Sequence, residues 1–250
     1  MTYLDHNFSF FKGEPVAYCI DKNANDLKIL HVSNERRRDS FKYKFREFLF
    51  FYHMPNIKNS RDCLYISGCS GSGKSHYAKT YIECYKKIFP KRKIFLFSKL
   101  KEDPTIDTVK PIRIKLDNEL LADPITPEEL QNSLCVFDDF DALRDGKLKN
   151  EIYGLIDEIL FDGRHFNIHC IITSHMITNY KKTRNILSEV NSITLFPQSI
   201  SFKNANYLLR NYLGLKQKQI DIILNLPSRW VTVFIRYPKF VLFQNGCYFL

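Results

Sequence analysis

The stretch "GCSGSGKS", residues 68–75, follows the apolar run "DCLYIS" and leads into "KSHYAKTYIECYKKIF", whose apolar residues recur at helical spacing. Gly, four residues and Gly-Lys-Ser between a strand and a helix form a loop whose backbone N–H groups bind phosphate. Lys74 is expected to reach the β- and γ-phosphates, and Ser75 to offer its hydroxyl to Mg²⁺. We therefore predict an ATP site made by the consecutive residues Gly68, Cys69, Ser70, Gly71, Ser72, Gly73, Lys74 and Ser75.

Predicted strands and helices alternate after this loop. The apolar runs "KIFLFS", "LCVFDDF", "IHCIITSH" and "NSITLFP" are predicted strands, separated mostly by helical patterns. Such alternation predicts an α/β P-loop NTPase fold with a mainly parallel sheet flanked by helices. Asn245-Gly246 between two apolar runs predicts a C-terminal β-hairpin. We expect residues 61–250 to form one P-loop ATPase domain.

Residues 1–60 differ in pattern and are expected to form a small N-terminal extension of unknown role. The runs "PVAYCI" and "LKILHV" predict two strands joined by the turn "DKNAND". The basic run Arg36-Arg37-Arg38 is typical of a solvated face. A helix is predicted farther along, from the spacing of Phe41, Phe45, Phe48 and Leu49.

Polar side chains follow two of the predicted core strands. The carboxyl ends of parallel strands meet at one sheet edge, so these side chains are expected beside the glycine loop. Asp138 is expected to hold a water of the Mg²⁺ shell, and Asp139 to orient or activate the attacking water. His175 is the candidate group that senses the γ-phosphate, although a histidine that merely ends a strand explains it nearly as well. Asp141 is expected to be solvated.

Two basic segments have both functional and ordinary interpretations. Arg164, in "FDGRHFN", is either an arginine finger donated to a neighbouring subunit's ATP or one half of a surface salt bridge. In "NYKKTR", the candidate contacts to nucleic-acid phosphates are Lys181, Lys182 and Arg184. A plain basic surface loop is an equally good interpretation of this segment.

The composition narrows the class of partner. The chain has 250 residues, a formal net charge of +10 and a pI of about 9.2, which favours an anionic partner such as nucleic acid. Its seven cysteines form no CxxC pair, so we expect reduced thiols and a reducing compartment. The N-terminus lacks a signal-peptide pattern, and no apolar run approaches the roughly 20 residues that span a bilayer, so we expect neither secretion nor membrane insertion.

Four motifs together resemble a known family. "LYISGCSGSGKS", "KIFLFS", "LCVFDDF" and "FDGRHFNIHCIITSH" are similar to the poxvirus-type DNA-packaging ATPases of nucleocytoplasmic large DNA viruses and virophages, in the FtsK–HerA branch of P-loop NTPases. The resemblance covers about residues 60–210. It implies a RecA/FtsK-like fold and an ATP- and Mg²⁺-dependent motor, assembled as a homo-oligomeric ring. It also implies that the motor moves double-stranded DNA into a capsid.

The resemblance carries site residues with it. Lys74 and Ser75 match the nucleotide-binding positions, and Asp138 and Asp139 match the metal and water-activating acids. His175 stands where many members carry Gln. The family implies contact with capsid or portal-vertex proteins, and a place in the host cytoplasm (the virus factory) and the virion.

Two other functions fit the glycine loop. A nucleoside or small-molecule kinase also has such a loop, but it usually has an arginine-rich lid, and the segment after "IITSH" offers only three basic residues. A nucleotide-dependent scaffold could bind DNA or a capsid protein without turnover. Phosphate release without an added acceptor separates the kinase from the ATPase.

Overall fold

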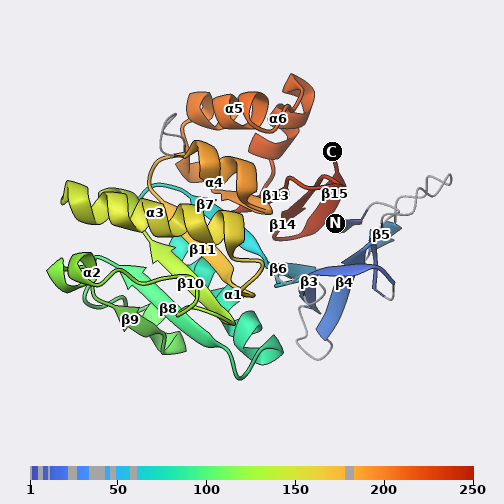
Figure 1. The fold of residues 1–250 in the computed structure, drawn as a ribbon. Helices are drawn as coiled ribbons and strands as arrows, with labels where there is room; N and C mark the ends of the chain where they lie inside the picture. Colours follow the sequence, from blue (N-terminus) through green and yellow to red (C-terminus); the bar gives the residue numbers. More distant parts are fainter. Residues whose placement is uncertain are drawn as a thin grey trace.

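The computed structural model describes residues 2–4, 8–10, 12–21, 27–33, 43–45, 49–56, 61–177 and 183–250. Its main sheet is mixed and lies between helices (Figure 1). The strand order is β5-β1-β15-β14-β13-β12-β7-β11-β10-β8-β9, and the run from β12 to β9 is parallel. The predicted α/β P-loop NTPase fold is confirmed.

Five parallel strands follow the predicted apolar runs, and a short sixth strand lies at the edge of the sheet. They are β7 (Cys63–Ser67), β8 (Lys93–Ser98), β9 (Ile112–Ile114), β10 (Ser133–Asp138), β11 (His169–Ser174) and β12 (Ser192–Leu195). The helices are α1 (Lys74–Ile88), α2 (Asn118–Ala122), α3 (Gly146–Asp162), α4 (Arg184–Glu189), α5 (Phe202–Asn211) and α6 (Gln217–Leu224). Short 3-10 turns lie at Ile106–Val109, Phe140–Ala142 and Pro197–Ser199.

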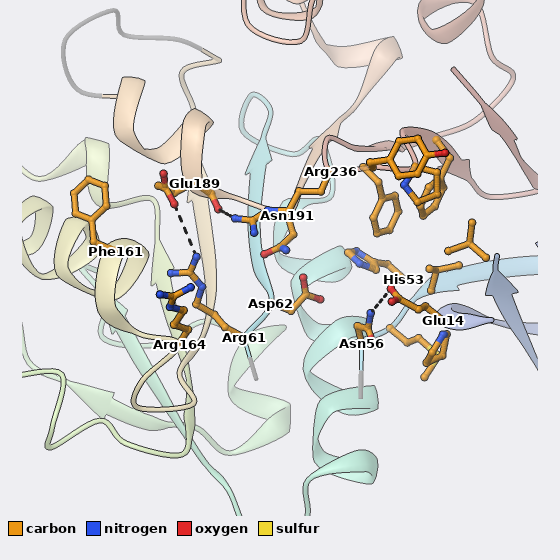
Figure 2. Close-up of a pocket in the computed structure, with 18 residues that line it drawn as sticks. Glu14, His53, Asn56, Arg61, Asp62, Phe161, Arg164, Glu189, Asn191 and Arg236 are labelled. Atoms are coloured by element: carbon orange, nitrogen blue, oxygen red, sulfur yellow. Dashed lines mark hydrogen bonds and ion pairs between the residues drawn. The ribbon is translucent and has the colours of Figure 1, made fainter. Parts of the chain in front are cut away.

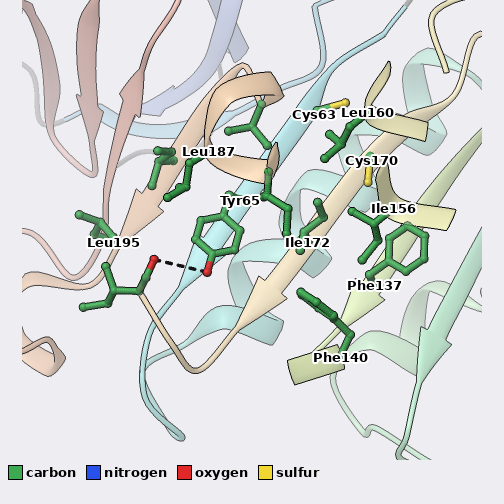
Figure 3. Packing of buried hydrophobic residues seen from close by; sticks show 14 of the residues in the cluster. Cys63, Tyr65, Phe137, Phe140, Ile156, Leu160, Cys170, Ile172, Leu187 and Leu195 are labelled. Atoms are coloured by element: carbon green, nitrogen blue, oxygen red, sulfur yellow. Dashed lines mark hydrogen bonds between the residues drawn. The ribbon is translucent and has the colours of Figure 1, made fainter. Parts of the chain in front are cut away.

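The central strand β7 is buried on both faces, as a strand of a parallel sheet must be when helices cover both sides. Its side chains alternate between two cores. Tyr65 joins the core that contains residues of α3 and α4 (Figure 3), whereas Leu64 and Ile66 pack with α1. This double burial fixes the register of β7 and therefore the position of the glycine loop that follows it.

Antiparallel strands complete one side of the main sheet: β13 (Val231–Phe234), β14 (Phe240–Phe243) and β15 (Gly246–Phe249). Phe243, the last residue of β14, pairs with Gly246, the first residue of β15. The predicted C-terminal hairpin is therefore confirmed. Two N-terminal strands then extend the sheet, with β1 (Thr2–Leu4) parallel to β15 and β5 (Tyr43–Phe45) antiparallel to β1.

A second, four-stranded antiparallel sheet is built from N-terminal residues in the order β2-β4-β3-β6. Its strands are β2 (Phe8–Ser9), β3 (Glu14–Asp21), β4 (Leu27–Val32) and β6 (Leu49–His53). It packs through Phe51 and Leu30 against β14 and β15. The two predicted strands are therefore confirmed, while most of the turn between them and the Arg36-Arg37-Arg38 run lie outside the described residues.

The predicted helix over residues 41–49 is wrong, because the residues that the structure describes there, β5 and the first residue of β6, are in strands. In β6, Phe51 is 1% exposed and Phe50 is 37% exposed, so burial follows the two-residue period of a strand. Dense aromatic residues gave a helix-like spacing, but the sheet of β3 and β4 supplies the pairing partner that decides the conformation. Among the described residues, no helix is both long and apolar enough to cross a membrane.

Candidate nucleotide site

The glycine loop has the backbone that the sequence predicts. Gly71 and Gly73 have φ values of 76° and 111°, in the left-handed region that favours glycine. A Cβ on Gly68 would lie 2.5 Å from Ser72 Oγ and 2.8 Å from a ring carbon of Phe196. The first turn of α1 holds no acidic residue and no side chain caps it, so its N–H groups and its positive dipole end face the loop. This arrangement suits a bound anion.

Lys74 is the buried cation of the loop, at 6% exposure. Its Nζ donates to the Gly68 carbonyl at 3.0 Å and to the Cys69 carbonyl at 3.4 Å. The same ammonium group lies 3.5 Å from Asp139 Oδ1 and 3.4 Å from His175 Nδ1. The glycine loop, the end of β10 and the end of β11 therefore meet at one sheet edge, as the strand order predicts.

Asp138 is a buried carboxylate at the end of β10, held from two neighbouring strands. Ser98 Oγ lies 3.1 Å from its Oδ2, and Thr173 Oγ1 lies 3.0 Å from its Oδ1. Burial, followed by the charge of Asp139, raises the pKa of the Asp138 carboxyl. A divalent cation beside this carboxylate would offset both effects.

The residues present fit Mg²⁺. Among the described residues, no group of three or more His, Cys, Asp and Glu side chains could hold a metal. Mg²⁺ needs no such cage, because one or two protein oxygens, phosphate oxygens and waters complete its octahedron. The Asp138 carboxylate and the Ser75 hydroxyl are oxygen donors of this kind.

Asp139 begins a sharp turn, with φ 44° in the left-handed region. Its backbone N–H donates to Thr173 Oγ1 at 2.8 Å, which fixes the turn against β11. His175 Nε2 lies 2.9 Å from Asp139 Oδ2. The imidazole thus contacts Asp139 through one ring nitrogen and Lys74 through the other. The side chain of His175 is 38% exposed, so it lies on the solvent-exposed side of the site.

Asp141 was expected to be solvated, and this prediction is wrong. Its Oδ2 accepts from Ser174 Oγ at 2.8 Å and from the backbone N–H groups of His175 and Met176 at 3.1 and 3.2 Å. Tyr65 of β7 also contacts this turn, because its Oη donates to the Met176 carbonyl at 2.6 Å. Asp141 therefore fixes the turn that carries His175. In the sequence, Asp141 is only the third acid of "DDFD", and no known motif spacing assigns a role to an acid at that position.

Arg164 does not join this group. It precedes β11, whereas His175 follows it, and the six residues of the strand span about 20 Å. Arg164 is exposed and lies with Arg61 and Asp62 around a cavity of about 590 Å³ at the opposite sheet edge (Figure 2). Within the part of the chain that the structure describes, its guanidinium has no hydrogen bond or ion pair. It cannot reach the glycine loop of its own subunit.

The candidate nucleic-acid residues are only partly placed. Arg184 is exposed at the start of α4. Lys181 and Lys182 lie outside the described residues. Their contact with nucleic acid stays a prediction.

The fold and the glycine loop are P-loop NTPase-like, and solved structures share this fold. B204, the DNA-packaging ATPase of Sulfolobus turreted icosahedral virus, aligns with a TM-score of 0.52 and 13% identity over 76% of this chain and 99% of B204. B204 of Sulfolobus turreted icosahedral virus 2 with ATPγS aligns with a TM-score of 0.50 and 14% identity over 75% and 98%. The pCW3 conjugation coupling protein TcpA with ATPγS gives 0.52 and 13% over 88% and 73%.

The sequence itself places the chain in a family. No family model matches it. It is 44% identical over 188 residues to the uncharacterized protein V3 of Sputnik virophage. The aligned region covers 74% of this chain and 76% of V3. The chain belongs to the V3 family of virophage proteins, so the resemblance predicted from the motifs is confirmed. At 13–14% identity, the likeness to B204 and TcpA shows the shared fold.

Proposed function

We propose that this protein is an ATP-hydrolysing motor that translocates double-stranded viral DNA into a capsid. The proposal depends on one observation: Lys74, Asp139 and His175 contact one another at 2.9–3.5 Å beside an anion-binding loop. A cation, a carboxylate and an imidazole at the place of a γ-phosphate suit hydrolysis. The description of B204 as a DNA-packaging ATPase supports the packaging role.

Each site residue has a role in this proposal. The loop amides and Lys74 bind the phosphates, while Ser75 and Asp138 hold Mg²⁺. The metal ion neutralises phosphate charge when bound. Asp139 orients the water that attacks the γ-phosphorus, and ADP and phosphate leave. Asp139 is one methylene shorter than the Glu of many motors, and its contact with His175 fixes the direction of the carboxylate.

The remaining basic residues act between subunits and on DNA in this proposal. Arg164 completes the ATP site of a neighbouring subunit in a homo-oligomeric ring. Lys181, Lys182 and Arg184 contact DNA phosphates with little sequence preference. Residues 61–250 form the ATPase domain, residues 1–60 extend it, and capsid or portal-vertex proteins are its partners in the host cytoplasm and the virion.

Phosphate release tests the proposal. The full chain is incubated with Mg²⁺ and ATP at low salt, with and without double-stranded DNA and with no phosphoryl acceptor. We expect release without acceptor, raised by DNA, and a stimulation that falls as salt rises because phosphate contacts release counterions. Acceptor-dependent transfer without hydrolysis would indicate a kinase, and binding without turnover a scaffold. Hydrolysis that ignores DNA would contradict the motor.

A pair of lysines on α1 provides the matched variants. Lys74→Ala removes the phosphate-facing ammonium and should lower kcat by about 100-fold or more. Lys79→Ala removes the half-buried partner of the exposed Glu83, an i,i+4 pair worth little, and should leave the rate unchanged. Unchanged nucleotide binding in Lys74→Ala would sink the nucleotide site itself.

A further inference from the structure

We propose that a cavity beside the start of α1 binds the nucleobase of the nucleotide. The cavity has a volume of about 360 Å³, and its walls include Tyr52, Gly73, His76, Arg229, Trp230 and Gln244. These residues come from β6, the glycine loop, α1, the segment before β13 and the turn after β14. The inference rests on the proposed nucleotide site and adds to it the recognition of the base.

The cavity adjoins the phosphate site at Gly73. Gly73 is the last glycine of the loop and also part of the cavity wall, and His76 follows Ser75 directly. A nucleotide whose phosphates contact the loop amides therefore has this cavity within the reach of its sugar and base. The larger cavity at Arg164 lies at the other sheet edge, so it cannot receive the base of the same nucleotide.

The chemistry of the walls suits a flat heterocycle. Trp230 is partly buried and Tyr52 is half-buried, so each offers aromatic surface to the cavity. Base–aromatic stacking is tolerant of sequence and strong, because every base has a π-face. His76 and Arg229 are exposed and lie at the polar rim, where they can bond the edge of a base or the sugar. Gln244 Oε1 accepts from the Arg229 N–H at 2.7 Å and fixes that rim.

The floor of the cavity is rigid. Tyr77 packs edge-to-face with Trp230 at 5.1 Å. The Tyr77 hydroxyl lies 2.6 Å from Thr232 Oγ1 and 2.9 Å from His53 Nδ1. These buried contacts join α1, β13 and β6, so the aromatic wall is held in place before a ligand arrives. A preformed apolar pocket with a few polar groups, at the small end of the ordinary range, is typical of a ligand site.

Trp230 is the single tryptophan of the chain, so its fluorescence reports on this cavity alone. The wild-type protein is titrated with Mg²⁺ and ATP, and separately with Mg²⁺ and tripolyphosphate, while calorimetry confirms saturation by each. We expect ATP to change the Trp230 emission and tripolyphosphate to leave it within error. Saturating ATP with unchanged emission, or equal changes with both compounds, would overturn the base assignment and leave the phosphate site standing. Failure of both compounds to bind would overturn the proposed function and this inference with it.

Affinity ratios give a second measurement. Trp230→Ala should weaken ATP about tenfold relative to tripolyphosphate, because only ATP loses a stacking partner. Phe202→Ala, an exposed aromatic on α5 that is not part of the cavity wall, should leave the ratio unchanged. An unchanged ratio in Trp230→Ala would contradict the proposal. If Trp230→Ala does not fold, the wild-type fluorescence decides the matter by itself.

Discussion

At the residue scale, Asp139 and His175 contact each other, and the proposed mechanism uses both. An aspartate is short for a water-orienting acid, and here it contacts both an ammonium and an imidazole. The imidazole in turn depends on its own backbone, which Asp141 holds through the N–H groups of His175 and Met176. The geometry of the site therefore depends on a carboxylate that touches neither phosphate nor Lys74 in the proposed mechanism. Asp141 is a positioning residue.

Asp141→Ala tests this role. Loss of the acceptor frees the turn after β11, so we expect kcat for ATP hydrolysis to fall about 10- to 100-fold, while KM for ATP stays within about twofold because the glycine loop is untouched. The control is Asp145→Ala, which removes the N-cap of α3 and should cost about 1 kcal/mol of stability without a change in kcat. Parallel losses of stability with no difference in kcat would reduce Asp141 to a structural role.

Strand β11 connects the two edges of the sheet at the element scale. It ends at the His175 turn and begins at His169, which is fully buried and has no hydrogen-bond partner on either ring nitrogen among the described residues. The ring packs between Tyr85 and Phe89, with centroid distances of 5.1 and 5.4 Å. Burial, with a smaller effect of Arg92, lowers the pKa of His169 to about 3.

This shift predicts acid sensitivity. Below the ordinary histidine pKa of about 6.5, the unfolded chain binds a proton that folded His169 does not, so the free energy of unfolding falls by about 1.4 kcal/mol per pH unit. Buried His53, whose pKa is also lowered to about 3, acts in the same direction. Asp62 acts oppositely between about pH 4 and 6, because burial raises its pKa to about 6.

His169→Phe should remove one of these contributions. Phenylalanine fits the same aromatic packing and takes no proton, so the fall in stability from pH 7.5 to pH 5 should shrink by about 2 kcal/mol. Urea denaturation at the two pH values measures the difference. Identical pH slopes for wild type and variant would show that His169 is protonated in the folded state.

The whole molecule separates its catalytic candidates. The glycine loop, Asp138, Asp139 and His175 lie at one edge of the main sheet. Arg164 lies at the other edge (Figure 2). An arginine at that position cannot assist hydrolysis in its own subunit. It can serve a neighbour only if the loop edge of one copy meets the Arg164 edge of the next, and heterologous contacts of this kind close into rings.

Mixing two inactive variants tests the ring arrangement. Lys74→Ala lacks the phosphate contact, and Arg164→Ala lacks the finger, so each alone should hydrolyse ATP at least about 100-fold more slowly than wild type. Co-assembled at equal amounts, roughly one interface in four pairs an intact Lys74 with an intact Arg164, so activity should return to about a quarter of wild type. A mixture as inactive as its components would refute action between subunits.

Local sequence patterns are sufficient to predict several parts of this protein. The glycine loop, the acids that end β10 and the His175 turn are each readable beside an apolar strand, and the edge rule for parallel sheets places them together. The hairpin at Asn245-Gly246 is equally local. These signals are reliable because double burial makes each strand apolar along its whole length.

The other features depend on contacts between segments that are distant in the sequence. Asp141 was predicted to be solvated, but the end of β11 and the turn after it provide three hydrogen-bond donors to its carboxylate. A helix was predicted over residues 41–49, but β6, which begins at Leu49, pairs with β3. The position of Arg164 at the edge opposite the glycine loop follows from the strand direction and from the cavity that it lines. The base cavity joins Tyr52, His76 and Trp230, which no periodicity connects. Sequence patterns report the local period of burial, whereas these features depend on contacts between distant segments, which packing alone fixes.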